Sequence, residues 1–139
     1  MAWKRPTVDT PYHIDWEWWK TNDRNYRIYL HEQLCPECRR LFPSPFDVEE
    51  VDWVDPKTAE VTVADALLMC LRMRCANDPD FVNEALPVAA AVFRVFLLND
   101  NKPMTPTELH EHLLWRQPET ILQVIGGYKT HFGIRPWNN

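Results

Sequence analysis

Residues 86–127 decide the fold, and they read LPVAAAVFRVFLLNDNKPMTPTELHEHLLWRQPETILQVIGG. Residues 87–98 are apolar on nearly every side, which predicts a helix buried at the centre of a core. A second helix is expected over residues 105–114, because it opens with an N-cap threonine, a first-turn proline and a capping-box glutamate. A third is expected over residues 118–125, where a proline stands at the start and two glycines follow the end. The stretch therefore predicts three consecutive helices.

The remaining sequence also favours helices over strands. Apolar side chains recur at helical spacing within residues 23–34 and predict a helix that ends before a Cys-Pro pair. Thr62 and Asp65 resemble a capping box and predict a helix over residues 63–75. Two short strands flanking the turn-like residues 55–58 predict a hairpin. We therefore expect a mainly α fold with minor β structure.

The chain has 139 residues, enough for one compact domain or two that share a core. An Asn-Asp-Pro break divides it into a Trp-rich helical region, residues 1–78, and a C-terminal domain, residues 79–139, and we expect the two to pack together. Residues 1–14 are expected to form an extended arm. No apolar run is long enough to span a bilayer and no signal peptide is apparent, so a cytoplasmic location without membrane association is expected.

From residue 86 onward, the order of helices resembles a winged-helix or related helix-turn-helix domain. The resemblance rests on residues 93–98, 104–114 and 118–127. In DNA-binding members of this family the third helix is the recognition helix, and the strand after it, here expected over residues 128–134, is the wing. The resemblance therefore implies that double-stranded DNA is contacted by Arg116, Thr120, Gln123, Lys129, His131 and Arg135.

These side chains would have different tasks on DNA. Lysine and arginine bind phosphates, so we expect Lys129 and Arg135 in that role, whereas Thr120 and Gln123 would face base edges. The leading hypothesis is a small DNA-binding or transcription-associated regulator. The net charge of −5 and the few basic positions keep a second hypothesis open, a protein-interaction adaptor or homodimer that uses the same fold without DNA. No nucleotide-binding, nucleophile-elbow or zincin motif occurs, so an enzyme is not expected.

Among the four cysteines, Cys35 and Cys38 form a C-x2-C motif. In a cytoplasmic protein the cysteines are expected to be reduced or bound to metal rather than joined in disulfides. A redox C-x2-C motif opens a helix after a strand, whereas this one follows a predicted helix. The sequence therefore favours zinc over redox chemistry.

A tetrahedral zinc ion needs two ligands besides this motif. The favoured set is His31, Cys35, Cys38 and Cys75, because His31 and Cys35 share a predicted helical face and Cys75 ends another helix. We expect the three sulfur atoms within about 4 Å of one another. A second set replaces His31 with Cys70, whose place in an apolar stripe also fits a core thiol. A reduced motif without metal, packed on the core, is the third interpretation.

Overall fold

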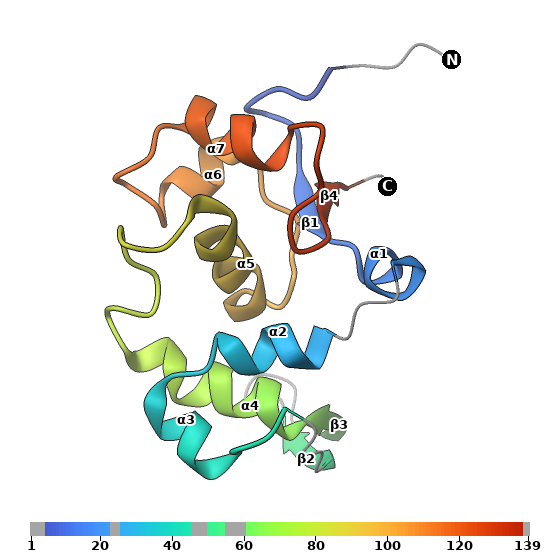
Figure 1. Cartoon of the computed structure of the whole chain (residues 1–139), viewed down its shortest axis with the longest axis vertical. Helices are drawn as coiled ribbons and strands as arrows, with labels where there is room; N and C mark the ends of the chain where they lie inside the picture. The colour runs from blue at the N-terminus through green and yellow to red at the C-terminus, as the bar shows by residue number, and fades with distance from the viewer. Residues whose placement is uncertain (1–4, 23–25, 46–49, 55–60, 138–139) are drawn as a thin grey trace. The chain divides into compact units, whose positions relative to one another are not determined.

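A computed structural model of the chain (Figure 1) describes residues 5–22, 26–45, 50–54 and 61–137. These residues are mainly helical with minor β structure, as the sequence predicts. The chain divides into two compact units: unit 1 joins Met1–Arg24 to Val82–Asn139, and unit 2 consists of Asn25–Phe81. The expected boundary after residue 78 lies close to a junction of the units. Residues 1–24, however, group with the C-terminal part of the chain.

Unit 1 contains elements from both ends of the chain. In chain order they are β1 (Tyr12–Ile14), α1 (Trp16–Thr21), α5 (Val88–Leu98), α6 (Pro106–His110), α7 (Pro118–Ile125) and β4 (Ile134–Pro136). The helix α7 packs against both α5 and α6, and the strand β1 contacts α5 and pairs with β4. In this way the first strand and the last strand close the unit around its central helix.

The helix α5 forms the core of unit 1, as its apolar sequence predicts. Phe93 and Phe96 are fully buried. The ring of Phe93 stacks on Phe132, with ring centroids 5.0 Å apart, and lies 6.0 Å from the ring of Trp19 in α1. Because buried aromatic rings contribute large apolar areas, these contacts anchor α1 and the segment before β4 on α5.

The start of α6 follows the local signals in the sequence. The Thr105 hydroxyl oxygen accepts a hydrogen bond from the Glu108 N–H at 3.1 Å, and the Glu108 carboxylate accepts one from the Thr105 N–H at 3.0 Å. This is the predicted capping box. The helix ends at His110, earlier than expected, because the N–H groups of residues 111 and 112 bond three residues back and tighten the last turn. By contrast, α7 has the predicted bounds.

The strand prediction over residues 128–134 is wrong for residues 128–133, and the chain enters a strand only at Ile134. Phe132 and Gly133 lie in a turn with positive φ angles of 54° and 71°. Strand β4 pairs antiparallel with β1, with Ile14 opposite Ile134. The partner of the last strand is therefore near the N-terminus, and residues 12–14 of the expected arm are part of the unit's sheet.

Asn101 holds β1 through its side chain. Its Oδ1 accepts a hydrogen bond from the Ile14 N–H at 2.7 Å, and its Nδ2 donates one to the Ile14 carbonyl at 2.9 Å. A positive φ of 57° at Asn101, which asparagine tolerates better than most residues, accompanies this arrangement. Tyr12 also exchanges two backbone hydrogen bonds with Met104. Consequently β1 is bonded on both edges, to β4 and to the loop after α5.

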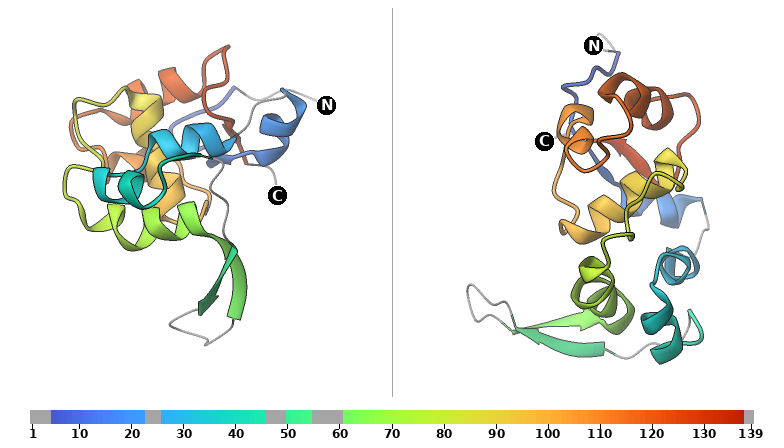
Figure 2. Two further views of the ribbon diagram at one scale, coloured as in Figure 1. Left: turned by 60° about the horizontal axis from the view of Figure 1, so that its bottom comes forward. Right: turned by 90° about the vertical axis from the view of Figure 1, so that its left-hand side faces the viewer.

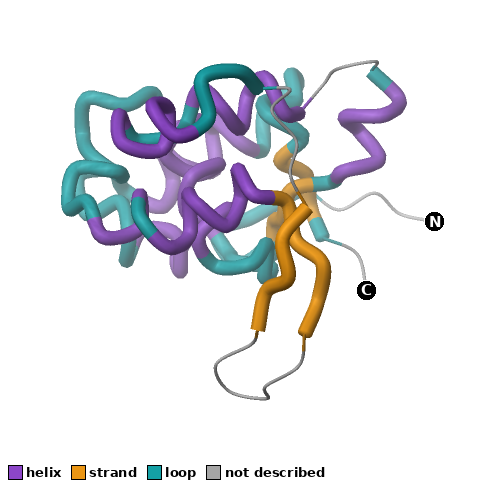
Figure 3. The backbone as a smooth tube through the Cα atoms, turned by 90° about the horizontal axis from the view of Figure 1, so that it is seen from below, coloured by secondary structure: helices purple, strands orange, loops and turns teal. Residues whose placement is uncertain are grey.

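Unit 2 is built around α4. Its elements are α2 (Tyr26–Glu32), α3 (Pro36–Leu41), β2 (Glu50–Val54), β3 (Val61–Asp65), α4 (Ala66–Met73) and a 3-10 helix, η1 (Cys75–Asn77). The helix α4 contacts α2, α3 and both strands. The strands β2 and β3 form the predicted antiparallel hairpin (Figures 2 and 3), while its expected turn lies outside the described residues. None of the helices in the described part of the chain has both the length and the apolar character that a membrane span requires.

Two helix boundaries in unit 2 differ from the sequence prediction. The capping box expected at residues 62–65 does not begin a helix, because residues 61–65 bond to β2 as a strand and α4 begins only at Ala66. The predicted helix before the C-x2-C motif ends at Glu32, and an additional helix, α3, begins at Pro36. Proline suits this first helical position because its missing N–H would have no helical partner there.

The substitution Phe96→Ala should destabilise unit 1 by about 3–5 kcal/mol, because it removes a fully buried ring and leaves a cavity. Leu114→Ala is the matched control, since Leu114 is 70% exposed, and should change the free energy of unfolding by less than about 0.5 kcal/mol. Denaturant unfolding followed by tryptophan fluorescence measures both. Wild-type stability of Phe96→Ala would contradict the assignment of α5 as the core.

Candidate metal centre

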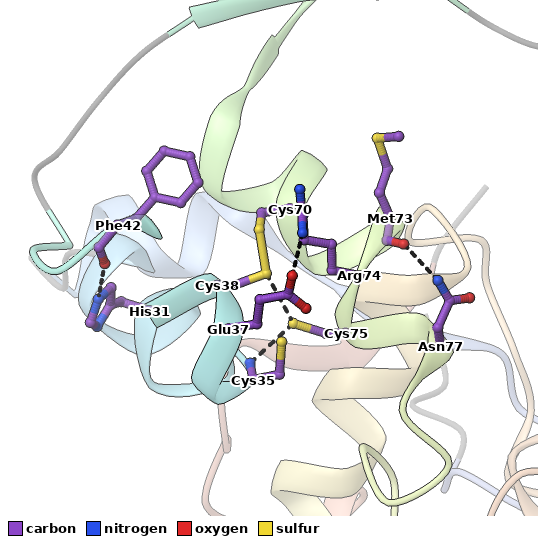
Figure 4. The surroundings of a disulfide bond; sticks show 10 residues. All are labelled: His31, Cys35, Glu37, Cys38, Phe42, Cys70, Met73, Arg74, Cys75 and Asn77. Atoms are coloured by element: carbon purple, nitrogen blue, oxygen red, sulfur yellow. Dashed lines mark hydrogen bonds and ion pairs between the residues drawn. A yellow bond between two sulfur atoms is a disulfide. The ribbon is translucent and has the colours of Figure 1, made fainter. Parts of the chain in front are cut away.

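All four cysteines lie where α3 packs on α4 in unit 2 (Figure 4). Cys35 is the N-cap of α3, and Cys38 lies in the first turn of the same helix. Cys70 lies in α4, and Cys75 begins η1 directly after it. The start of one helix and the end of another thus bring two sequence-distant cysteine pairs together.

Cys38 and Cys70 form a disulfide, with their Cα atoms 6.1 Å apart. For these two residues the structure corrects the expectation of reduced or metal-bound cysteines. Both side chains are buried, and they come from helices that pack against each other. The contact between α3 and α4 therefore supplies the pairing, which the spacing along the chain does not reveal.

Three of the cysteines form a group that could hold a metal ion. The sulfur atoms of Cys35, Cys38 and Cys75 all lie within 4.8 Å of one another, and the Cys75 thiol lies 3.6 Å from the Cys38 sulfur. Sulfur ligands at about 2.3 Å from one tetrahedral zinc ion are about 3.8 Å apart. The distance between Cys38 and Cys75 fits this value, whereas the group as a whole, with atoms within 4.8 Å of one another, is wider than the expected value of about 4 Å. The Cys35 N–H also donates a hydrogen bond to the Cys75 sulfur at 3.0 Å.

The predicted ligand His31 is not brought into this group. Its Nε2 lies 2.7 Å from the Phe42 carbonyl oxygen, and Figure 4 shows its ring directed away from the cysteines. The predicted shared face of His31 and Cys35 required one continuous helix, but α2 ends at Glu32. The alternative ligand Cys70 does reach the group, through its bond to Cys38.

Charged side chains also lie beside the cysteines. Glu37, inside the C-x2-C motif, forms an ion pair with Arg74, the residue between α4 and η1. Both side chains are about half exposed, 55% and 49%, so the pair contributes at most about 1 kcal/mol. A guanidinium N–H of Arg39 donates to the Glu32 carbonyl. These contacts join α3 to its two neighbouring helices around the sulfur atoms.

The predicted DNA-contacting residues lie on α7 and on the segments that flank it. Arg116, Gln123 and Lys129 are exposed, whereas Thr120 and His131 are half-buried. Arg135 is exposed in β4 and lies 3.6 Å from the Asp15 carboxylate. The structure thus leaves the first three side chains accessible on unit 1.

The sixth predicted residue, Arg135, belongs to a different environment from the others. It is paired in register with His13 of β1. Burial lowers the pKa of His13, Asp15 raises it, and Arg135 lowers it, with a net result below the ordinary value. The charge of Arg135 therefore interacts with Asp15 and His13 beside the two-stranded sheet.

No protein-family model, curated protein or solved structure matches this chain.

In metal-free protein, reduction of the Cys38–Cys70 disulfide should lower the free energy of unfolding of unit 2 by about 3–4 kcal/mol, because a loop spanning 32 residues is released in the unfolded chain. Denaturant unfolding with a chelator, with and without reductant, measures the difference. Cys35→Ser is the control: it keeps the disulfide and should show the same sensitivity to reductant. Identical unfolding midpoints in both conditions would contradict a stabilising disulfide.

Proposed function

We propose that this protein is a zinc-stabilised DNA-binding regulator. In its reduced form, unit 2 binds one structural zinc ion through Cys35, Cys38, Cys70 and Cys75. Unit 1 binds double-stranded DNA through α7 and its flanking segments.

The convergence of all four cysteines carries the zinc part of the proposal. Cys38 is bonded to Cys70 and lies 3.6 Å from Cys75, and Cys35 belongs to the same sulfur group. Reduction would therefore leave four thiols around one point. Thiolate sulfur is a soft donor that favours zinc, and a C-x2-C pair with a second cysteine pair is a common structural donor set.

A zinc ion held by four cysteines would be structural, because no coordination position stays open for water or substrate. The buried setting of Cys38 and Cys75 supports this role. Metal affinity at such a site is folding free energy, which would suit a unit with a small core. This closed donor set is also the reason that we do not propose an enzyme.

The surface of α7 supports the DNA-binding part. Arg116 immediately before α7, Gln123 on the helix and Lys129 after it are all exposed. Tyr128, beside Lys129, is fully exposed and can contact the sugar-phosphate backbone. These residues would let α7 approach a groove with basic side chains at both ends. Arg135 is not among the proposed DNA contacts, because the nearby Asp15 carboxylate partly neutralises its charge.

The net negative charge of the chain disfavours DNA binding, but this charge is not evenly distributed between the two units. Unit 1 carries nine basic and nine acidic side chains, whereas unit 2 carries six basic and eleven acidic ones. The net charge of −5 therefore belongs to unit 2, and unit 1 is neutral overall. A neutral unit can bind phosphates through a local basic surface more readily than one with an acidic excess.

A protein-interaction adaptor is the second candidate, and the same surface carries one observation in its favour. Leu114, in the loop before α7, is 70% exposed, and Tyr128 after α7 is fully exposed. Glu119 adds an exposed negative charge to α7. Exposed apolar and aromatic side chains of this kind can anchor a protein partner.

The zinc proposal predicts about one zinc ion per chain in protein purified under reducing conditions, measured by elemental analysis. Cys70→Ser should lose most of this zinc, because a three-cysteine site lacks its fourth thiolate. His31→Gln is the matched control and should retain it, since the His31 ring faces the Phe42 carbonyl. Retention in Cys70→Ser together with loss in His31→Gln would reverse the ligand assignment.

The DNA proposal predicts that affinity for a duplex falls steeply as salt rises, measured by fluorescence anisotropy. The double substitution Arg116→Ala with Lys129→Ala should weaken binding to all sequences and flatten the salt slope by about two units, one for each phosphate contact. Gln123→Ala should change the preferred sequence instead.

The control for this experiment is Arg135→Ala, which removes one positive charge from β4 and should leave the salt slope unchanged. Wild-type protein without affinity for any duplex at low salt would reject DNA binding and favour the adaptor.

A further inference from the structure

The Cys38 sulfur takes part in two arrangements that exclude each other. It is bonded to the Cys70 sulfur, and it is also a member of the group that could hold a metal ion. A sulfur atom in a disulfide has lost the thiolate charge with which it would bind zinc. Four-thiolate zinc binding and the Cys38–Cys70 disulfide therefore cannot exist in one molecule at the same time.

We propose that Cys38 and Cys70 form a reversible oxidation site at which a peroxide converts the zinc-bound thiolates into the disulfide and expels the zinc ion. The inference rests on the proposed zinc site, and it adds a modification with a defined chemical class of oxidant. It also accounts for the presence of both features, a metal-sized sulfur group and a disulfide, in the same few residues.

The backbone geometry suits a change between the two forms. The Cα atoms of Cys38 and Cys70 are 6.1 Å apart, within the usual range of 4.4–6.8 Å for disulfides. Cys75 lies close enough to Cys38 for a shared metal ion, at 3.6 Å between sulfur atoms. Exchange between metal binding and disulfide formation would thus need only small movements of the side chains on α3 and α4.

The chemical step is a two-electron oxidation. Cys70 keeps 8% of its surface exposed and Cys38 none, so the Cys70 thiolate attacks one oxygen of the peroxide. The O–O bond breaks, which gives a sulfenic acid and hydroxide. The Cys38 thiolate then attacks the Cys70 sulfur, the S–S bond forms, the S–O bond breaks, and a second hydroxide leaves. Both electrons have passed from the sulfur atoms to the peroxide, and the zinc ion has lost two ligands.

The oxidised form would stay folded after the metal leaves. The disulfide joins α3 to α4 across 32 positions of the sequence, which are the two helices that the zinc ion would also join. The covalent bond therefore replaces the metal as the cross-link of unit 2. Cys35 and Cys75 are left as thiols, so the change of state alters the metal content and the thiol content of the unit without unfolding it.

The test begins with the full chain, reduced and loaded with zinc, whose metal content is measured before any oxidant is added. Hydrogen peroxide is then added, and zinc release is followed with a chromophoric chelator. We expect loss of the whole zinc equivalent, a fall from four titratable thiols to two after denaturation, and a Cys38–Cys70 cross-link by peptide mapping. Reductant with added zinc should restore the starting state.

Two variants serve as a matched pair in this experiment. Cys75→Ser keeps both disulfide partners and should form the same cross-link with peroxide, even though its zinc binding is weakened. Cys70→Ser should form no Cys38–Cys70 cross-link under the same conditions. Circular dichroism of the oxidised wild type should match that of the zinc form.

The outcomes separate the two proposals. If the reduced chain holds no zinc before oxidation, both the zinc site and its oxidation are rejected. If it holds zinc, but peroxide leaves the metal in place or joins Cys35 to another cysteine, the oxidation site is rejected while the zinc site stands.

Discussion

The joining of α3 to α4 at the cysteines is the constraint on which unit 2 depends. Among the residues of unit 2 whose burial the structure describes, Phe81 is the one buried aromatic residue, and the other buried apolar side chains are four leucines, three cysteines and one methionine. Domains of this size bury little apolar surface and are only marginally stable, so small folds commonly add a disulfide or a metal ion. The Cys38–Cys70 bond provides such a link. A zinc ion on the same residues would provide an equivalent one.

Unit 1 reaches stability in a different way. Trp19, Tyr12, Phe93 and Phe96 are almost fully buried there, and large rings contribute far more apolar area than the leucines of unit 2. The Asn101 side chain and β4 then fix β1 from both edges. As a result, α6 and α7 are held on a core of large side chains without a disulfide, since all four cysteines lie in unit 2. A helix placed in this way is suited to present a fixed surface to DNA or to a protein partner.

The two units also differ in charge, and this difference links structure to the proposed function. The acidic excess of the chain lies in unit 2, whereas unit 1 is neutral and exposes Arg116 and Lys129 around α7. Electrostatic attraction to phosphates acts over about a Debye length, so a local basic surface matters more than the charge of the whole chain. The net negative charge of the whole chain, taken alone, argues against DNA binding, whereas the exposed basic residues of unit 1 favour it.

Local signals in the sequence were sufficient to predict α5, α7, the start of α6, the cysteine motif and the existence of a hairpin, although β3 extends through residues 62–65, where a helix start was expected. These features depend on neighbouring residues: the apolar run of α5, the bonds between Thr105 and Glu108, and the proline that opens α7. The tertiary structure alone decided the partner of β4. A short strand can pair with any exposed strand edge, and β4 pairs with residues 12–14. The tertiary structure also decided that Cys70, and not His31, lies with the other cysteines. That choice depended on where α2 ends and on the packing of α3 against α4, and neither is encoded in the spacing of the residues concerned.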